Sequence, residues 1–356
     1  MKFFHNMYFA FIVLIISVFV FGFSLYQYGL SGVSNDDTLK EIVIEPGTID
    51  SIANTLYKRD LIKNKNVFKL YVKLSGESNL KAGTYSLSED MSVQEIVKIL
   101  SEGVGGNPNQ IKVTFKEGIN MRKLAMVIEE NTNHTTDEVY ALLKDKEYLR
   151  TLISKYWFLN DMILNENIYY SLEGYLYPNT YYFDSEDVSI ESIFESMLKE
   201  TESQLRPYKE QLQNSSMTLH QTLTLASIIE LEGVTLEDRK GIAGVFLNRL
   251  DSNMTLGSDV TTYYGLKVDM GERDLYSSEL KECNNYNTRC ATFAELPISP
   301  ICNPSIDSII SVLEPTNEDY YYFVADKNRK VYFSKNITEH NNTIANLKRQ
   351  DLWYEY

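Results

Sequence analysis

Two glutamates end an apolar stretch, Leu219 to Glu232, that contains no other acidic or strongly basic side chain. They are Glu230 and Glu232. Burial disfavours the charged form of a carboxyl group, so an acid at the end of an apolar helix can keep a proton near neutral pH and act as a general acid. The alternative is that both are solvated residues of a last helical turn, where acids interact unfavourably with the helix dipole. The pattern indicates a candidate acid site at residues 230–232.

Helical geometry separates the two candidates. Residues two apart on a helix point to nearly opposite sides, so only one of the acids is expected to enter a given cleft. Each acid has an apolar row behind it at helical spacing, and periodicity does not choose between them. Gly233 is predicted to end the helix, and Thr235 with Asp238 has the form of a capping box that starts the next one.

The composition bounds the class of protein. A chain of 356 residues, 44 % hydrophobic and 23 % charged, is long enough for two or three folded domains. Its formal net charge of −15 argues against a nucleic-acid partner, because phosphate binding needs basic patches. The 4 histidines are not spaced with the cysteines, so no metal site is expected, and the sequence implies no cofactor.

The N-terminus carries a membrane signal. Residues 8–28 are almost continuously apolar, and no Asp, Glu, Lys or Arg lies between Lys2 and Asp36. About 20 such residues are needed to cross a bilayer as a helix. A cleaved signal peptide is the alternative, but bulky residues stand where a small-residue cleavage site is needed. We expect a single-pass anchor with a short cytoplasmic tail (residues 1–7), and the positive-inside tendency places the catalytic portion outside the cytoplasm.

Three cysteines, Cys283, Cys290 and Cys302, fall in one late region. Cys283 and Cys290 enclose a short loop that a disulfide would close in an oxidising compartment. Three reduced thiols are the alternative, and the sequence leaves the two open.

The remaining pattern predicts an α+β protein in two parts. After a polar tether (29–40), residues 41–106 read as a compact unit of alternating short strands and amphipathic helices. A breaker cluster at residues 105–108 forms the predicted boundary, and residues 107–356 form the larger part. Within the larger part, residues 254–265 read as turn-rich, and residues 320–334 read as a β-hairpin.

An ordered set of short motifs resembles the endolytic murein transglycosylases, membrane-anchored enzymes that cut peptidoglycan glycan strands. The resemblance runs from Ile42 to Leu347. The motifs are KAGTYSL (81–87), FKEG (115–118), LEGYLYPNTYYF (172–183), LASIIELE (225–232), GVFLNRL (244–250), LGSDVTTYYG (256–265), YNT (286–288), LPISPICNP (296–304), YYFVAD (321–326) and FSK with EHN (333–341). Each motif alone is weak, and their succession is specific.

The resemblance implies a small LysM-like unit followed by a lysozyme-related catalytic domain. It places the catalytic glutamate at Glu232, with Glu230 as the second candidate. The motif match also makes Glu173 a site candidate. The further candidates for substrate binding are polar residues that equally suit turns: Ser258, Asp259, Tyr286, Asn287 and Thr288.

Four positions depart from the family pattern. They are Gly233, Gly257 in place of a usual glutamine, Val260 in place of a usual proline, and Arg289 where an aromatic residue is common. None of them removes the acid.

The reaction that the resemblance implies is cleavage between N-acetylmuramic acid and N-acetylglucosamine, leaving 1,6-anhydro ends. The expected partners are glycan strands, the membrane and the machinery of cell-wall synthesis. The alternative is a non-catalytic, membrane-tethered scaffold that binds peptidoglycan. A serine or metal-dependent peptidase has little support, because the chain has neither a Gly-x-Ser-x-Gly nor a His-Glu-x-x-His motif.

Overall fold

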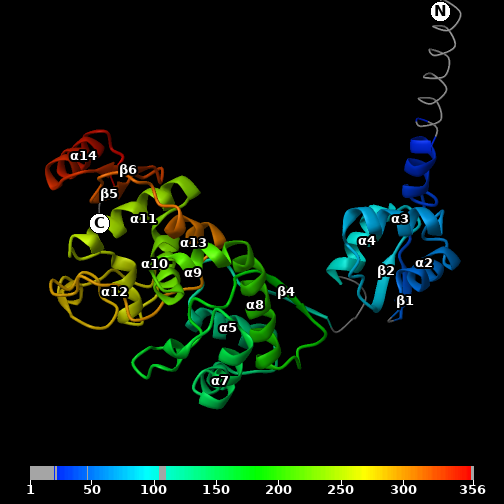
Figure 1. The fold of residues 1–356 in the computed structure, drawn as a ribbon, viewed down its shortest axis with the longest axis horizontal. Helices are drawn as coiled ribbons and strands as arrows, with labels where there is room; N and C mark the ends of the chain where they lie inside the picture. Colours follow the sequence, from blue (N-terminus) through cyan, green and yellow to red (C-terminus); the bar gives the residue numbers. More distant parts are fainter. Residues whose placement is uncertain (1–19, 21, 46, 104–109, 354–356) are drawn as a thin grey trace, which may run out of the picture. The chain divides into compact units, whose positions relative to one another are not determined.

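The computed structural model describes residues 20, 22–45, 47–103 and 110–353, and it mixes helices with short strands (Figure 1). The chain divides into two compact units. The first comprises the residues up to Ile111 together with Tyr182–Ser185, and the second comprises Lys112–Tyr181 and Glu186–Tyr356. The predicted boundary after Gly106 lies outside the described residues.

The first unit has its own hydrophobic core. Its elements are β1 (Lys40–Ile44), α2 (Ile49–Lys58), α3 (Lys65–Ser75), β2 (Gly83–Leu87) and α4 (Val93–Glu102). The strands pair antiparallel, with Ile42 opposite Tyr85. These side chains are buried with Leu56, Phe68 and Leu100 from the three helices. Side-chain caps begin each helix, so local signals and burial agree on this unit.

The predicted membrane anchor falls mostly outside the described residues. Of residues 8–28, the structure describes residue 20 and residues 22–28, which are helical. Within the described ranges, no helix is both long enough and apolar enough to span a bilayer.

The second unit is mainly helical. Its strands β5 (Tyr322–Ala325) and β6 (Val331–Ser334) pair as the predicted hairpin. Strand β3 (Ile111–Thr114) pairs with β4 (Thr180–Phe183), and each of these two strands has residues in both units. The helices are α5 (Met121–Asn131), α6 (Thr136–Leu142), α7 (Lys146–Lys155), α8 (Ile190–Leu205), α9 (Lys209–Asn214), α10 (Leu219–Glu232), α11 (Leu236–Asp251), α12 (Asp259–Gly265), α13 (Ile306–Leu313) and α14 (Ile337–Arg349). Three short 3-10 turns connect them: η1 (Asp161–Leu164), η2 (Arg206–Tyr208) and η3 (Glu279–Lys281).

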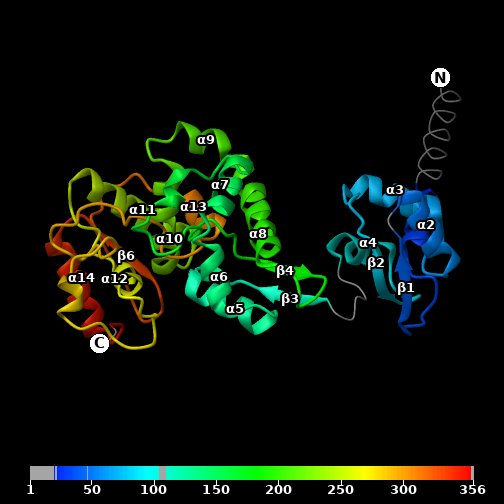
Figure 2. The same ribbon diagram turned by 90° about the horizontal axis from the view of Figure 1, so that it is seen from below.

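Helix α10 lies at the centre of this unit, against α11 and α13 (Figure 2). Every residue from Thr222 to Ile229 is buried, so this stretch of the helix has no exposed face. Helix α11 comes close to the loop after α13 because Gly244 has no side chain: a Cβ there would lie 2.4 Å from the backbone oxygen of Thr316. The predicted capping box of Thr235 and Asp238 starts α11.

One local prediction was wrong. Residues 259–265 form helix α12, whereas the sequence reads as turns. The β-branched residues Val260, Thr261 and Thr262 are weak helix formers. Tertiary contacts stabilise the helix instead, because the Thr262 hydroxyl donates to Asn287 Oδ1 at 2.6 Å.

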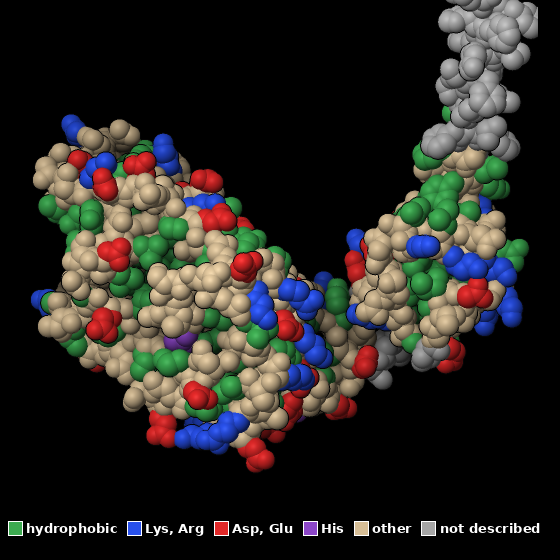
Figure 3. Space-filling model, viewed as in Figure 1, with side chains coloured by type: hydrophobic (Ala, Val, Ile, Leu, Met, Phe, Trp, Pro, Cys, Tyr) green, Lys and Arg blue, Asp and Glu red, His purple; other side chains and the backbone are tan. Residues whose placement is uncertain are grey.

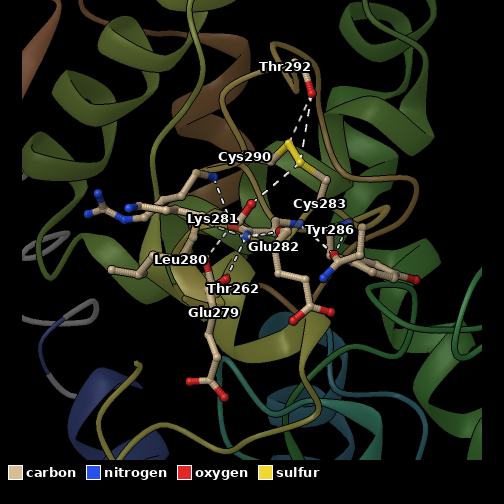
Figure 4. The surroundings of a disulfide bond; sticks show 12 residues. Thr262, Glu279, Leu280, Lys281, Glu282, Cys283, Tyr286, Cys290 and Thr292 are labelled. Carbon is tan, nitrogen blue, oxygen red and sulfur yellow. Dashed lines mark hydrogen bonds between the residues drawn. A yellow bond between two sulfur atoms is a disulfide. The ribbon is translucent and has the colours of Figure 1, made fainter. Parts of the chain in front are cut away.

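A disulfide joins Cys283 and Cys290, and the Thr292 hydroxyl lies beside both sulfurs (Figure 4). The disulfide closes the loop of residues 283–290, which contains Arg289. Cys302 is a buried free thiol. On the face of the second unit drawn in Figure 3, positive and negative side chains are intermixed.

Candidate active site

Glu232, the last residue of α10, lines a cleft of about 810 Å³. The Ser258 hydroxyl donates a hydrogen bond to Glu232 Oε1 at 2.6 Å. Ser258 is buried and directly precedes α12, so the carboxyl group is held between two helices distant in sequence. This contact fixes the direction in which the acid points.

The surroundings raise the pKa of Glu232 above its ordinary value. Burial is the main cause, and the negative charge of Asp259 acts in the same direction. The Ser258 hydrogen bond and the cations Arg289 and Arg249 act against it. Because burial outweighs these contacts, a larger fraction of Glu232 carries a proton near neutral pH than for an exposed glutamate. That is the state a general acid needs.

The cleft wall combines apolar and polar side chains from well-separated segments. Arg249 from α11 is fixed by hydrogen bonds from Nε to the Tyr321 carbonyl (2.6 Å) and from Nη1 to the Leu256 carbonyl (2.7 Å). Arg289 pairs with Asp259. The apolar part of the lining includes Phe246, Leu256, Val260, Phe323, Val324, Val331 and Trp353. Such a wall suits a ligand with both apolar faces and polar groups, as sugars have.

Glu230 has a different environment. Its Oε1 accepts from Arg239 Nη2 at 2.8 Å, and its Oε2 accepts from the backbone N–H and hydroxyl of Ser305 and from the Ser308 hydroxyl at 2.6–2.9 Å. The Glu230 side chain is only 5 % exposed, and it does not line the cleft. The structure therefore separates the two candidate acids, and Glu230 ties α10 to α11 and α13.

Gly233 allows this arrangement. It follows the last residue of α10, and its N–H bonds to the Ile229 carbonyl with extended backbone. A Cβ at this position would lie 2.7 Å from Cγ of Arg239. The absence of a side chain lets Arg239 pass close to the helix end and reach Glu230.

Two of the predicted substrate-binding residues, Ser258 and Asp259, line the cleft with Glu232. Tyr286, Asn287 and Thr288 do not, and all three are buried. Thr288 accepts from the Ser258 N–H at 3.0 Å, and Asn287 donates to the Glu282 carbonyl at 2.6 Å. Thr288 therefore holds the backbone of Ser258, and Asn287 holds the loop that precedes it in the chain.

Glu173 is buried away from the cleft, where its Oε2 accepts from the Met121 N–H at 2.9 Å and from the Tyr264 hydroxyl at 3.0 Å. Burial raises the pKa of Glu173 to about 8, because the protein interior disfavours the carboxylate more than these two hydrogen bonds favour it. At neutral pH it is mostly the neutral acid. Glu173 therefore lies in the core, next to the first residue of α5.

Sequence reasoning missed several cleft residues, of which the clearest are Arg249, Phe323, His340 and Trp353. Arg249, Phe323 and His340 lie inside quoted motifs, which were the only available signal, whereas Trp353 lies outside them. These residues come from α11, β5, α14 and the segment after α14, and only the tertiary fold brings them to Glu232. Among the described residues, no group of three or more His, Cys, Asp or Glu side chains is arranged to hold a metal ion.

A carboxylic acid with a raised pKa, held by one hydroxyl in a cleft, is an arrangement that suits acid–base catalysis. Comparison with known proteins identifies the family to which the chain belongs. The chain belongs to the YceG-like family, whose model matches residues 42–346. The resemblance predicted from the sequence is thereby confirmed, and with it an enzyme of the lyase class.

The curated relatives carry one name. The chain is 37 % identical over 327 residues to the endolytic murein transglycosylase of Bacillus subtilis (strain 168), which covers 91 % of this chain and 88 % of that protein. It is 29 % identical over 354 residues to the endolytic murein transglycosylase of Streptococcus pneumoniae (serotype 2, strain D39), covering 94 % of this chain and 64 % of that protein.

A solved structure has a similar fold. The crystal structure of a yceG-like protein from Listeria monocytogenes matches with a TM-score of 0.61 and 36 % sequence identity, covering 86 % of this chain and 99 % of that one.

Replacing Glu230 is expected to destabilise the second unit. Glu230→Ala leaves Arg239 as an unpaired cation in a nearly buried position, which costs about 3–5 kcal/mol of unfolding free energy. Both tryptophans, Trp157 and Trp353, lie in the second unit, so denaturant unfolding followed by tryptophan fluorescence reports on that unit. The matched control is Glu232→Gln, which should change the unfolding free energy by less than about 1 kcal/mol. Equal stability of the two variants would contradict the structural role of Glu230.

Glu173 makes stability depend on pH. Its folded pKa of about 8 lies above the ordinary value of 4.5, so the folded protein binds more protons than the unfolded chain between these values, and stability falls as pH rises through this window. Glu173→Gln should flatten this fall, because an amide mimics the neutral acid. Unfolding at pH 5 and pH 9 checks it: the stability difference between variant and parent should favour the variant more at pH 9. A difference that does not change with pH excludes the effect.

Proposed function

We propose that this protein is an endolytic lytic transglycosylase that cuts the glycan strands of peptidoglycan. The observation that carries the proposal is Glu232, a glutamic acid with a raised pKa that the Ser258 hydroxyl holds in a cleft of about 810 Å³. Family membership supplies the substrate class, because the curated relatives are named murein transglycosylases. The bond cut is the β-1,4 bond between N-acetylmuramic acid and N-acetylglucosamine.

In the proposed mechanism, Glu232 acts first as acid and then as base. The protonated carboxyl group donates its proton to the oxygen that leaves with N-acetylglucosamine, as the bond to the anomeric carbon breaks. The carboxylate then takes the proton of the C6 hydroxyl of N-acetylmuramic acid, whose oxygen attacks the anomeric carbon. The products are a 1,6-anhydro end and a free 4-hydroxyl, and Glu232 is protonated again.

A single acid is sufficient for this route. Hydrolysis ordinarily needs a second carboxylate to activate water or to attack the sugar. The other carboxylates that line the cleft, as far as the structure describes it, are Asp259 and Asp274, and Asp259 is already paired with Arg289. An internal nucleophile also avoids bringing in a second reactant, an advantage of roughly 7–11 kcal/mol in well-oriented cases.

The proposed location is the outer face of the cell membrane, with residues 8–28 as a single-pass anchor. The length and apolarity of that segment support the anchor. The Cys283–Cys290 disulfide fits an oxidising compartment outside the cytoplasm. The first unit, with a core of its own, fits a separate LysM-like glycan-binding module. An enzyme so placed would act on strands close to the machinery that synthesises them.

Glu232→Gln is expected to abolish cleavage while the protein still folds. The amide keeps the size of the side chain and its contact with Ser258 but has no proton to donate, so activity should fall by at least about 10²–10⁴-fold. Purified peptidoglycan is incubated with the full-length protein in detergent, and the products are analysed by mass spectrometry. An unchanged unfolding transition, followed by tryptophan fluorescence, shows that the loss of activity comes from the missing acid and not from a loss of folding.

The parent's products decide between the candidate functions. Anhydro-muramic ends support the lytic reaction, and reducing ends would make the protein a hydrolase. The absence of any product from the parent, together with retained binding to peptidoglycan, would favour the membrane-tethered scaffold. Full activity of Glu232→Gln would overturn the assignment of the acid.

Ser258 should set the pH range of the reaction. Its hydrogen bond lowers the pKa of Glu232, so Ser258→Ala raises that pKa. Because the acid works in its protonated form, the alkaline limb of kcat/KM should move to higher pH, while the maximum falls as the carboxyl group loses its orientation. Ser252→Ala, an exposed serine on the same unit, is the matched control. An unshifted alkaline limb would show that Ser258 does not act on the acid.

A further inference from the structure

A second cavity, of about 520 Å³, lies in the second unit, and no residue that lines it lines the cleft. It is formed by residues of α6 and α7, by the segment 164–171 and by the turn after α12. Its chemically distinctive residues are three tyrosines and three lysines: Tyr140, Tyr169, Tyr170, Lys144, Lys146 and Lys267. None of these residues has a role in the reaction described above.

The tyrosines present half-buried aromatic surface to this cavity. The rings of Tyr140 and Tyr170 are stacked, with centroids 5.6 Å apart, and the ring of Tyr169 stands at 76° to that of Tyr170. All three side chains are partly exposed. Tyrosine offers a rigid apolar face with a polar tip, a combination that suits the C–H faces and hydroxyl groups of a sugar ring.

The lysines give the cavity a positive rim in a chain whose formal net charge is −15. Lys146 is paired with Glu166 at 2.5 Å. Lys144 and Lys267 have no ion-pair partner among the described residues, and both are exposed. Lys267 Nζ lies 4.4 Å from the centre of the Tyr169 ring, which places a cation directly beside the aromatic surface.

The backbone of Lys267 is strained. Its φ of 57° lies in the left-handed region, which residues other than glycine, asparagine and aspartate rarely adopt. Such strain persists where the surrounding structure fixes it, and it concentrates at functional positions. Here it turns the chain immediately after α12 and sets the lysine over Tyr169.

We propose that this cavity is a second binding site for the peptidoglycan strand, one that takes a sugar unit with its acidic peptide substituent. The tyrosines would contact the sugar ring, and Lys144 and Lys267 would pair with carboxylates of the peptide. The inference rests on the proposed function for its substrate class. It adds a site remote from the reacting bond that favours long, peptide-bearing strands.

The second site contacts the support of the catalytic acid through Tyr169. The Tyr169 N–H donates to the Tyr286 hydroxyl at 3.0 Å, and the two rings lie 4.5 Å apart. The Tyr169 hydroxyl donates to the Gly265 carbonyl, the last residue of α12, at 2.8 Å. Tyr286 precedes Asn287 and Thr288, and Thr288 holds Ser258. A ligand bound to Tyr169 would therefore contact a residue that is hydrogen-bonded to Tyr286 and Gly265, which belong to the segments that position Ser258 and, through it, Glu232.

The first test measures binding without cleavage. In the full-length Glu232→Gln protein, Lys144→Gln with Lys267→Gln should weaken binding of purified uncrosslinked strands about 3- to 10-fold. The control, Lys112→Gln with Lys116→Gln, removes two exposed positive charges elsewhere in the same unit. Strands stripped of their peptides should bind the two double variants equally. Equal affinity of the double variants for peptide-bearing strands would overturn the proposal.

The second test measures cleavage in proteins that retain Glu232. The KM for long peptide-bearing strands, relative to that for a tetrasaccharide, should rise in the Lys144/Lys267 variant and not in the control, with kcat for long strands equal in both. An equal rise for both substrate lengths would place the lysines at the cleft and refute a remote site. If the parent cuts neither substrate, the proposed function fails, whereas the binding comparison still decides on the second site.

Discussion

The C-terminal end of α10 depends on one constraint, the opposite directions of side chains two residues apart on a helix. Glu230 points inward, where it accepts four hydrogen bonds from Arg239, Ser305 and Ser308. That network fixes the rotation of the helix about its axis. Glu232 consequently emerges in the cleft. The buried position of Glu230 is thus the reason why Glu232 has a defined position.

The other half of the site is built by hydrogen bonds between segments distant in sequence. Thr288 holds the Ser258 backbone, and the Ser258 side chain holds Glu232. Asn287 fixes the preceding loop by donating to carbonyl groups at residues 279, 280 and 282. The buried Tyr-Asn-Thr segment is therefore linked to Glu232 through Ser258.

Short-range sequence patterns predicted much of the structure around α10. The features that they did not predict depend on contacts between residues far apart in the sequence. The end of α10 at Gly233, the capping box of Thr235 and the two-acid geometry all follow from short sequence patterns. The choice of Glu232 over Glu230 came from the family resemblance, because the partners of Glu230 lie 9 to 78 residues away. Long-range contacts also explain why the sequence did not predict α12, whose weak helix formers are stabilised by Asn287. They likewise explain why it did not predict the burial of Glu173 next to the N-terminus of α5. Whether any residue binds substrate stays a prediction.

Arg289, one of the departures from the family pattern, bears directly on the strength of the acid. The charge of Asp259 raises the pKa of Glu232, and that of Arg289 lowers it. Arg289 and Asp259 pair with one another and act on the pKa of Glu232 in opposite directions, while burial remains the largest cause of its rise. A neutral aromatic side chain at residue 289 would leave Asp259 unpaired beside the acid. In this chain the ion pair therefore limits how far the pKa of Glu232 rises.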